Sequence, residues 1–142
     1  MIEDDELCEL IPHSGSMCLL QRVLEWDEQR ILCESLSHKQ RDNPLLRNGC
    51  LSSIHALEYG AQAMAVHGGL LARKRGEKLR GGYLAALREV KLRLLDLSQL
   101  QGSLLIEAVE LMSEGGNLMY SFQVTANGEQ LVAGRATVIE TR

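Results

Sequence analysis

One helix-patterned segment stands alone among strand-patterned segments, and this arrangement limits the fold more than any other feature of the chain. Apolar residues recur at helical spacing at positions 54, 57, 61, 64, 65 and 71. Ser52 or Ser53 can cap the N-terminus of this helix, and Gly68-Gly69 weakens its end. We therefore expect a single long helix that buries its apolar stripe against one sheet.

Strand patterns precede and follow this helix. Residues 19–27 and 30–36 are two short runs separated by a polar turn, as in a hairpin. Four further runs are expected to form an antiparallel meander at 83–94, 103–112, 118–125 and 131–139. The turns between the last three contain Gly and Asn, which adopt positive φ readily. The face of this sheet away from the helix must then be covered elsewhere, and dimerisation is the simplest means.

Length and composition indicate one globular domain, residues 1–142, with 45% hydrophobic and 24% charged residues. The net charge of −4 argues against a nucleic-acid binder that relies on bulk positive charge. No apolar run approaches the length of a membrane span, and the acidic start MIEDDELCEL is unlike a signal peptide. These features predict a cytoplasmic protein.

The cysteines and histidines do not have the spacing of metal ligands. The four cysteines contain no CxxC pair and do not combine with the four histidines into a ligand pattern; they are Cys8, Cys18, Cys33 and Cys50. We interpret them as small apolar residues in a reducing compartment. We expect no metal and no cofactor.

Glu58 is the residue of the helix with the most informative chemistry. It lies in HALEYGAQAMAVH (55–67), among positions of the apolar stripe, and buried glutamates are normally paired or functional. We favour a functional role, the alternative being a helix residue that points to solvent. Gln62, one turn later, either hydrogen-bonds beside Glu58 or is simply a polar neighbour.

Four stretches together carry a family resemblance: IPHSGSMCLLQRVLEWD (11–27), LEYGAQAMAVHGGL (57–70), GGYLAALREVKL (81–92) and GRATV (134–138). They resemble the dehydratases of 3-hydroxyacyl carrier proteins that are related to the fatty-acid dehydratase, most closely the dehydratase-like proteins of aryl-polyene clusters. The resemblance covers nearly the whole chain. It implies the α+β hotdog fold, in which a curved, mainly antiparallel sheet of about six strands wraps one long central helix.

The resemblance also implies a chemistry. In these dehydratases a loop histidine removes the C2 proton of the acyl chain, and a helix carboxylate contributed across the dimer handles the departing 3-hydroxyl. Backbone N–H groups at the start of the helix polarise the thioester carbonyl. Glu58 matches the helix carboxylate, with Gln62 beside it, and substrate contacts are expected at Gly49, Ser52 and Ser53.

Asn43, in RDNPLL, occupies the position of the loop histidine. An amide does not titrate near neutral pH, so Asn43 cannot be a general base. The family's Pro or Pro-Gly at the helix start is also replaced, by CLSSIH. His55 either reaches the cavity of Glu58 or is a polar residue of the first turn. We expect the other histidines to lie in a solvated loop (His38) or at fold-level or surface positions (His13 and His67).

Three functions remain open at this point. The leading hypothesis is a 3-hydroxyacyl-thioester dehydratase, a lyase of fatty-acid or polyene-type biosynthesis. The alternatives are a hotdog acyl-CoA thioesterase that uses Glu58 with Asn43, and the partner subunit of a hotdog heterodimer.

The expected partners are an acyl carrier protein or a coenzyme A thioester, and a second hotdog chain in a homodimer or heterodimer. A basic segment is the candidate docking site for the carrier or coenzyme A, unless it is only a solvated connection; it comprises Arg73, Lys74, Arg75, Lys78 and Arg80.

Overall fold

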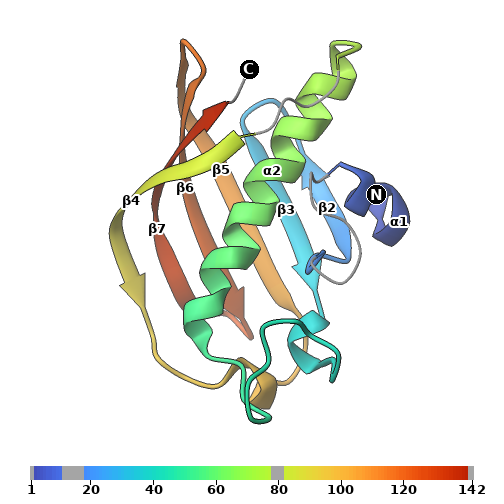
Figure 1. The fold of residues 1–142 in the computed structure, drawn as a ribbon, viewed down its shortest axis with the longest axis vertical. Coiled ribbons are helices and arrows are strands. Elements are labelled where there is room, and N and C mark those ends of the chain that lie inside the picture. Colours follow the sequence, from blue (N-terminus) through green and yellow to red (C-terminus); the bar gives the residue numbers. More distant parts are fainter. Residues whose placement is uncertain (1, 11–17, 78–81, 141–142) are drawn as a thin grey trace.

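A computed structural model of the chain describes residues 2–10, 18–77 and 82–140. The long helix α2 (Ala56–Lys74) lies across one face of a seven-stranded antiparallel sheet (Figure 1). The strand order is β1-β2-β3-β5-β6-β7-β4, so β4 comes after α2 in the chain but lies at the far edge of the sheet. This arrangement confirms the predicted single helix on a mainly antiparallel sheet.

The predicted strands are all present. Their bounds are β2 (Arg22–Trp26), β3 (Arg30–Ser35), β4 (Gly82–Leu92), β5 (Leu104–Glu114), β6 (Asn117–Ala126) and β7 (Glu129–Glu140). The sequence analysis missed the short elements, because runs of two to six residues carry little periodicity. These are β1 (Ile2–Glu3), α1 (Asp4–Glu9) and the 3₁₀ turns η2 (Ser37–Lys39), η3 (Ser53–His55) and η4 (Leu97–Gln99).

The predicted hairpin turns are also confirmed. In the β2–β3 turn the Asp27 carboxylate accepts hydrogen bonds from the backbone N–H groups of Gln29 (2.7 Å) and Arg30 (2.8 Å). These bonds hold the pKa of Asp27 below its usual value. The β6–β7 turn places Asn127 (φ 53°) and Gly128 (φ 78°) in the left-handed region, as a tight two-residue hairpin requires.

The predicted apolar stripe of α2 is wrong in orientation. The helix residues that are buried include Tyr59, Gly60, Ala63 and His67, and none of these four belongs to the predicted stripe. At Gly60 the helix approaches the sheet so closely that a Cβ atom would lie 2.8 Å from the Phe122 ring. Of the predicted stripe, Met64 is buried, Leu57 and Ala61 are partly buried against the core, and Ile54 is exposed, so α2 carries apolar residues on more than one side.

His67, which we expected at a fold-level or surface position, and His38, which we expected in a solvated loop, are both buried. His67 is fully buried: its Nε2 donates to the Asp27 carbonyl (2.9 Å), so its Nδ1 must accept from the Tyr120 hydroxyl (2.7 Å). It thus joins α2 to the β2–β3 turn and to β6. His38 is 1% exposed, because η2 packs against η4, and burial lowers its pKa.

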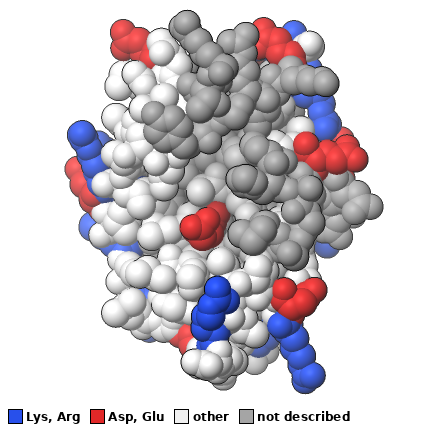
Figure 2. All heavy atoms as spheres, in the orientation of Figure 1, with Lys and Arg blue, Asp and Glu red and all other residues white. Residues whose placement is uncertain are grey.

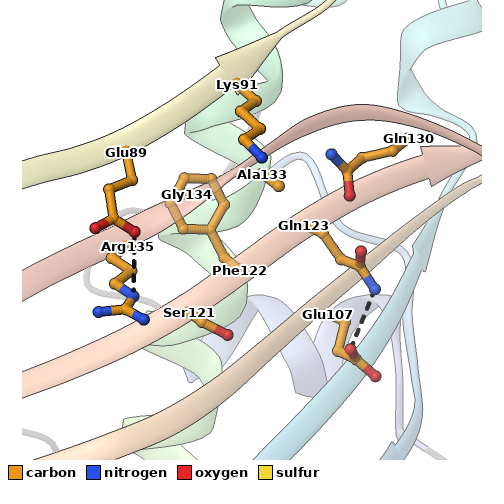
Figure 3. Close-up of a pocket in the computed structure, with 10 residues that line it drawn as sticks. All are labelled: Glu89, Lys91, Glu107, Ser121, Phe122, Gln123, Gln130, Ala133, Gly134 and Arg135. Carbon is orange, nitrogen blue, oxygen red and sulfur yellow. Dashed lines mark hydrogen bonds and ion pairs between the residues drawn. The ribbon is translucent and has the colours of Figure 1, made fainter.

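The face of the sheet away from α2 is largely polar, which corrects the expectation that it must be covered by a partner. Arg30 pairs with Glu107 (2.7 Å), to which Gln123 also donates (3.3 Å). Arg135 and Glu89 form a second pair, 3.6 Å apart (Figure 3). Such ion pairs are compatible with solvent, so this face does not require a partner to cover it.

The cysteines are not uniformly reduced. Cys18 is disulfide-bonded, whereas Cys33 and Cys50 are free thiols. Burial raises the pKa of the Cys33 thiol to about 12, so this thiol is inert at neutral pH. The interpretation as small apolar residues holds for Cys33 and is wrong for Cys18.

Candidate functional site

Glu58 is exposed on the outward side of α2. The apolar residues around it on this side are Ile54, which is 50% exposed, and the half-buried Leu57, Ala61 and Ala65. In the view of Figure 2, with α2 in front of the sheet, most described side chains in the middle of the face are uncharged, and an acidic side chain lies near the centre. A carboxylate on an apolar surface of this kind is placed to act in an interface.

The apolar surface continues onto β4. Leu84 and Leu87 are 41% and 38% exposed, and they lie opposite Val138 and the buried Ala136, hence on the α2 side of the sheet. Within the described part of the chain β4 pairs only with β7, so one side of this 11-residue strand has unpaired backbone groups. A long unpaired edge beside an apolar strip is typical of a subunit interface.

Asn43 does not face this surface but is buried, with 6% exposure. Its amide donates to the Ser37 carbonyl (2.9 Å) and to the Tyr59 hydroxyl (3.2 Å). Its Oδ1 accepts from the Leu45 N–H (2.8 Å), which makes an Asx turn in the loop before α2. Both the nitrogen and the oxygen of the Asn43 side-chain amide are thus hydrogen-bonded within the chain.

The Asn43 bonds belong to a buried polar network that joins this loop to α2. The Tyr59 hydroxyl lies 2.7 Å from the Ser37 hydroxyl, which lies 2.9 Å from that of Ser35. Ser35 in turn donates to the Leu19 carbonyl (2.5 Å). Burial raises the pKa of Tyr59, so its hydroxyl stays protonated. The sequence analysis missed Tyr59 because nothing local marks its distant partners.

Ser52 and Ser53 at the start of the helix are engaged in structural bonds. The Ser52 side chain caps η3 by accepting from the Ile54 N–H (3.3 Å). The buried Ser53 hydroxyl donates to the Arg93 carbonyl (2.7 Å) and accepts from the Leu95 N–H (3.1 Å). The Ser53 N–H donates to the Leu95 carbonyl (2.9 Å). These groups fix the helix start to the segment after β4.

Asp96 also links the segment before the helix to the segment after β4. The sequence analysis did not single it out. Its Oδ1 accepts from the backbone N–H groups of Leu51 (2.8 Å) and Ser98 (3.0 Å) and from the Ser98 hydroxyl (2.6 Å). These bonds lower its pKa to about 2, with the Ser98 hydroxyl as the largest cause. The sequence signal was the Asp-x-Ser pattern of a helix cap.

The remaining candidates are dispersed. The Gln62 side chain accepts from the Leu19 N–H (2.7 Å), and His55 is half-buried at the N-cap of α2. Gly49 is exposed in a tight turn, with φ of 75°. The structure therefore places Glu58 and Asn43 in different surroundings, one exposed and one within the buried network.

The basic segment lies at the opposite end of α2. Arg73 pairs with Glu6 (2.7 Å) and Lys74 with Glu28 (3.1 Å), while Arg75 is exposed. Lys78 and Arg80 lie outside the described residues, as does His13. Internal ion pairs therefore engage two of the five cations that the sequence suggested for docking.

Two cavities are lined by described residues, and Glu58 lines neither. One of about 390 Å³ lies on the outer face of the sheet, among residues of β4 to β7 (Figure 3). The other, of about 570 Å³, lies at the C-terminal end of α2 beside Trp26 and Leu70. No group of residues suited to hold a metal ion occurs in the described ranges. No helix there is long and apolar enough to cross a membrane.

A model of the ApeP-like dehydratases matches residues 6–142 of the chain. The chain belongs to the ApeP-like dehydratase family. No curated protein sequence matches it. Among solved structures, a chain of the dehydratase heterocomplex ApeI:P from Xenorhabdus doucetiae is similar, with TM-score 0.86 and 25% identity over 96% of this chain and 91% of that chain. The hotdog fold predicted from the sequence is confirmed by this match.

Thioesterases share the fold of this ApeP-like chain at much lower identity. A hypothetical thioesterase of Streptococcus pneumoniae with coenzyme A has TM-score 0.61 and 11% identity over 84% of each chain. A thioesterase of Pseudomonas aeruginosa has TM-score 0.60 and 11% identity over 83% of this chain and 78% of that chain. These two likenesses show a common fold and carry no argument about the reaction.

Proposed function

We propose that the chain is the carboxylate-bearing subunit of a hotdog heterodimer that dehydrates 3-hydroxyacyl thioesters in fatty-acid or polyene-type biosynthesis. The observation that carries the proposal is the position of Glu58, exposed within an apolar surface that a second subunit can cover. The match to a dehydratase heterocomplex supports a heteromeric assembly.

The proposed reaction divides acid and base between the two subunits. A base from the partner removes the C2 proton, and protonated Glu58 delivers a proton to the 3-hydroxyl as the C3–O bond breaks. The products are water and a 2-enoyl thioester.

The loop before α2, which contains Asn43, supports the assignment of the acid and the base to different subunits. Asn43 has no titrating group and has each end of its amide in a hydrogen bond. At the helix start, the Ser53 N–H and hydroxyl are also bonded within the chain. This loop thus serves as scaffold, and the proposal assigns the base to the partner.

The test is a dehydration assay of the chain alone and together with its co-encoded hotdog partner, on 3-hydroxyacyl thioesters. We expect enoyl product from the pair, none from the chain alone, and a loss of at least about 100-fold in kcat for Glu58→Gln, in the range of general-acid catalysis. Glu77→Gln removes an equally exposed carboxylate beyond the end of α2 and should retain activity. Full activity of the Glu58→Gln pair would refute the proposal.

Thiol release from acyl-CoA, measured in the same reactions, tests the thioesterase alternative. We expect no release above the background of a Glu58→Gln pair. Release that depends on Glu58, without enoyl product, would replace the dehydratase proposal by the thioesterase one.

A further inference from the structure

The outer face of β4 carries a row of cations that the sequence analysis did not single out. We define the β4 strip as Arg88, Lys91, Arg93 and Arg135, all of them exposed. Arg88 and Lys91 lie opposite Arg135 and Ala133 of β7, so their side chains leave the sheet on the face away from α2. Lys91 and Arg135 are visible there around the outer cavity (Figure 3).

The β4 strip keeps a net positive charge. Two carboxylates lie in it: Glu89 pairs with Arg135, and Glu129 pairs with Arg93. Within the described residues Arg88 and Lys91 have no ion-pair partner, so four cations against two carboxylates leave a net charge of +2. Arg88 and Arg135 are directly opposite one another, a like-charge arrangement that destabilises a sheet unless anions neutralise it.

The described cations of the basic segment at the end of α2 are used differently. Arg73 pairs with Glu6 (2.7 Å) and Lys74 pairs with Glu28 (3.1 Å). In the β4 strip, by contrast, Arg88 and Lys91 have no ion-pair partner among the described residues. These two side chains are therefore available to an acidic partner, on an otherwise acidic chain.

The Arg93 end of the β4 strip adjoins the start of the helix that carries Glu58. The Ser53 hydroxyl donates to the Arg93 carbonyl (2.7 Å). Glu58 follows Ser53 by roughly 8 Å along the helix axis. Because the strip lies on the face of the sheet away from α2, a substrate arm that starts from it would pass around the edge of β4 to reach the carboxylate.

We propose that the β4 strip docks the acidic surface of the carrier protein that delivers the acyl thioester. From Arg88 to Arg93 the strand extends about 15 Å, which matches about ten residues of an acidic helix. The cations are spread along this length instead of converging on one point, which fits a protein surface better than a single phosphate. This inference rests on the proposed function, because it assumes a carrier-bound substrate for Glu58.

The test measures binding separately from catalysis. Fluorescence anisotropy follows the binding of labelled, phosphopantetheinylated acyl carrier protein to the chain assembled with its hotdog partner. The Arg88→Gln/Lys91→Gln variant should bind the carrier about tenfold more weakly, because each exposed ion pair contributes up to fivefold. The Arg73→Gln/Lys74→Gln variant carries the same charge change at the end of α2 and should bind within twofold of the unmodified pair.

Free coenzyme A serves as the second ligand. We expect its affinity to be unchanged by Arg88→Gln/Lys91→Gln, and carrier binding to weaken as salt is raised. Equal carrier binding by both double variants and the unmodified pair, or a larger loss at Arg73 and Lys74, would overturn the inference. A loss of coenzyme A binding equal to that of carrier binding would overturn it too, because it would indicate a phosphate site.

Failure of the inference and failure of the proposed function can be told apart. If Glu58→Gln abolishes dehydration while Arg88→Gln/Lys91→Gln binds the carrier normally, the proposed function stands and the docking inference falls. If Glu58→Gln leaves dehydration intact, the proposed function falls regardless of how the carrier binds.

Discussion

Restoring a histidine at position 43 should destabilise the protein without creating activity. Asn43→His removes two donated hydrogen bonds, to Ser37 and Tyr59, and the bond accepted from the Leu45 N–H. Each is worth about 1 kcal/mol net. The imidazole is also larger than the amide at a site that is 6% exposed, and overpacking of this kind costs about 1–3 kcal/mol.

The expected total for Asn43→His is about 4–6 kcal/mol, a large part of the roughly 5–15 kcal/mol of a typical domain. Urea denaturation followed by circular dichroism measures this value. Asn43→Asp is the matched variant, because it keeps the Oδ1 acceptor and the shape but loses the amide donors, and should lose about 1–2 kcal/mol. Combined with Tyr59→Phe, the two losses should not be additive, because both variants remove the same 3.2 Å bond.

Two results would refute this reasoning. One is an Asn43→His protein whose free energy of unfolding lies within about 0.5 kcal/mol of the original, since the hydrogen bonds would then carry no weight. The other is dehydration by the Asn43→His chain without its partner, since position 43 would then be a vacant base site and not scaffold.

Three further perturbations test the core. Gly60→Ala should lower the free energy of unfolding by about 1–2 kcal/mol, because the clash of the new methyl group with the Phe122 ring costs more than the better helix propensity of alanine contributes. Adding Phe122→Leu to this variant should restore part of the lost stability, as measured by thermal unfolding. Tyr120→Phe should cost about 1–3 kcal/mol in urea, because it leaves the buried Nδ1 of His67 without a donor; an unchanged midpoint would contradict the assigned tautomer. His38→Phe should flatten the fall in stability between pH 7 and pH 5. The lowered pKa of His38 means that the unfolded chain takes up a proton from about pH 6.5 downward while the folded chain resists it, and equal slopes for both proteins would show that His38 does not contribute.

The element order was predictable because its signals are local. The hairpin turns rest on Gly and Asn at positive φ, and each strand has its own alternation. The orientation of α2 was not predictable in the same way. Tyr59, Gly60 and Ala63 face the sheet while Leu57 and Ala61 face outward, so both sides of the helix are apolar and periodicity selects neither.

The candidate site was predictable only in part. The resemblance singled out Glu58 and Asn43, but their surroundings depend on contacts between distant residues. Asn43 is bonded to Tyr59, and His67 to Tyr120, across 16 and 53 positions of the chain. The ion pairs of the basic segment could not be foreseen for the same reason: Arg73 and Lys74 are consecutive cations in the sequence, yet each pairs with a glutamate from another part of the chain.

Because α2 is apolar on its outward side as well, the proposed heterodimer has a consequence for how its two chains would be supplied in the cell. Chain made in excess of the protein that covers its outward side would display an apolar helix and the free backbone of β4 together. Exposed apolar surface and unpaired strand edges promote aggregation. Degradation of the surplus by quality-control proteases would then set the abundance of this subunit by that of its partner. Synthesis of the two chains from one transcript would avoid the aggregation and degradation of excess chain.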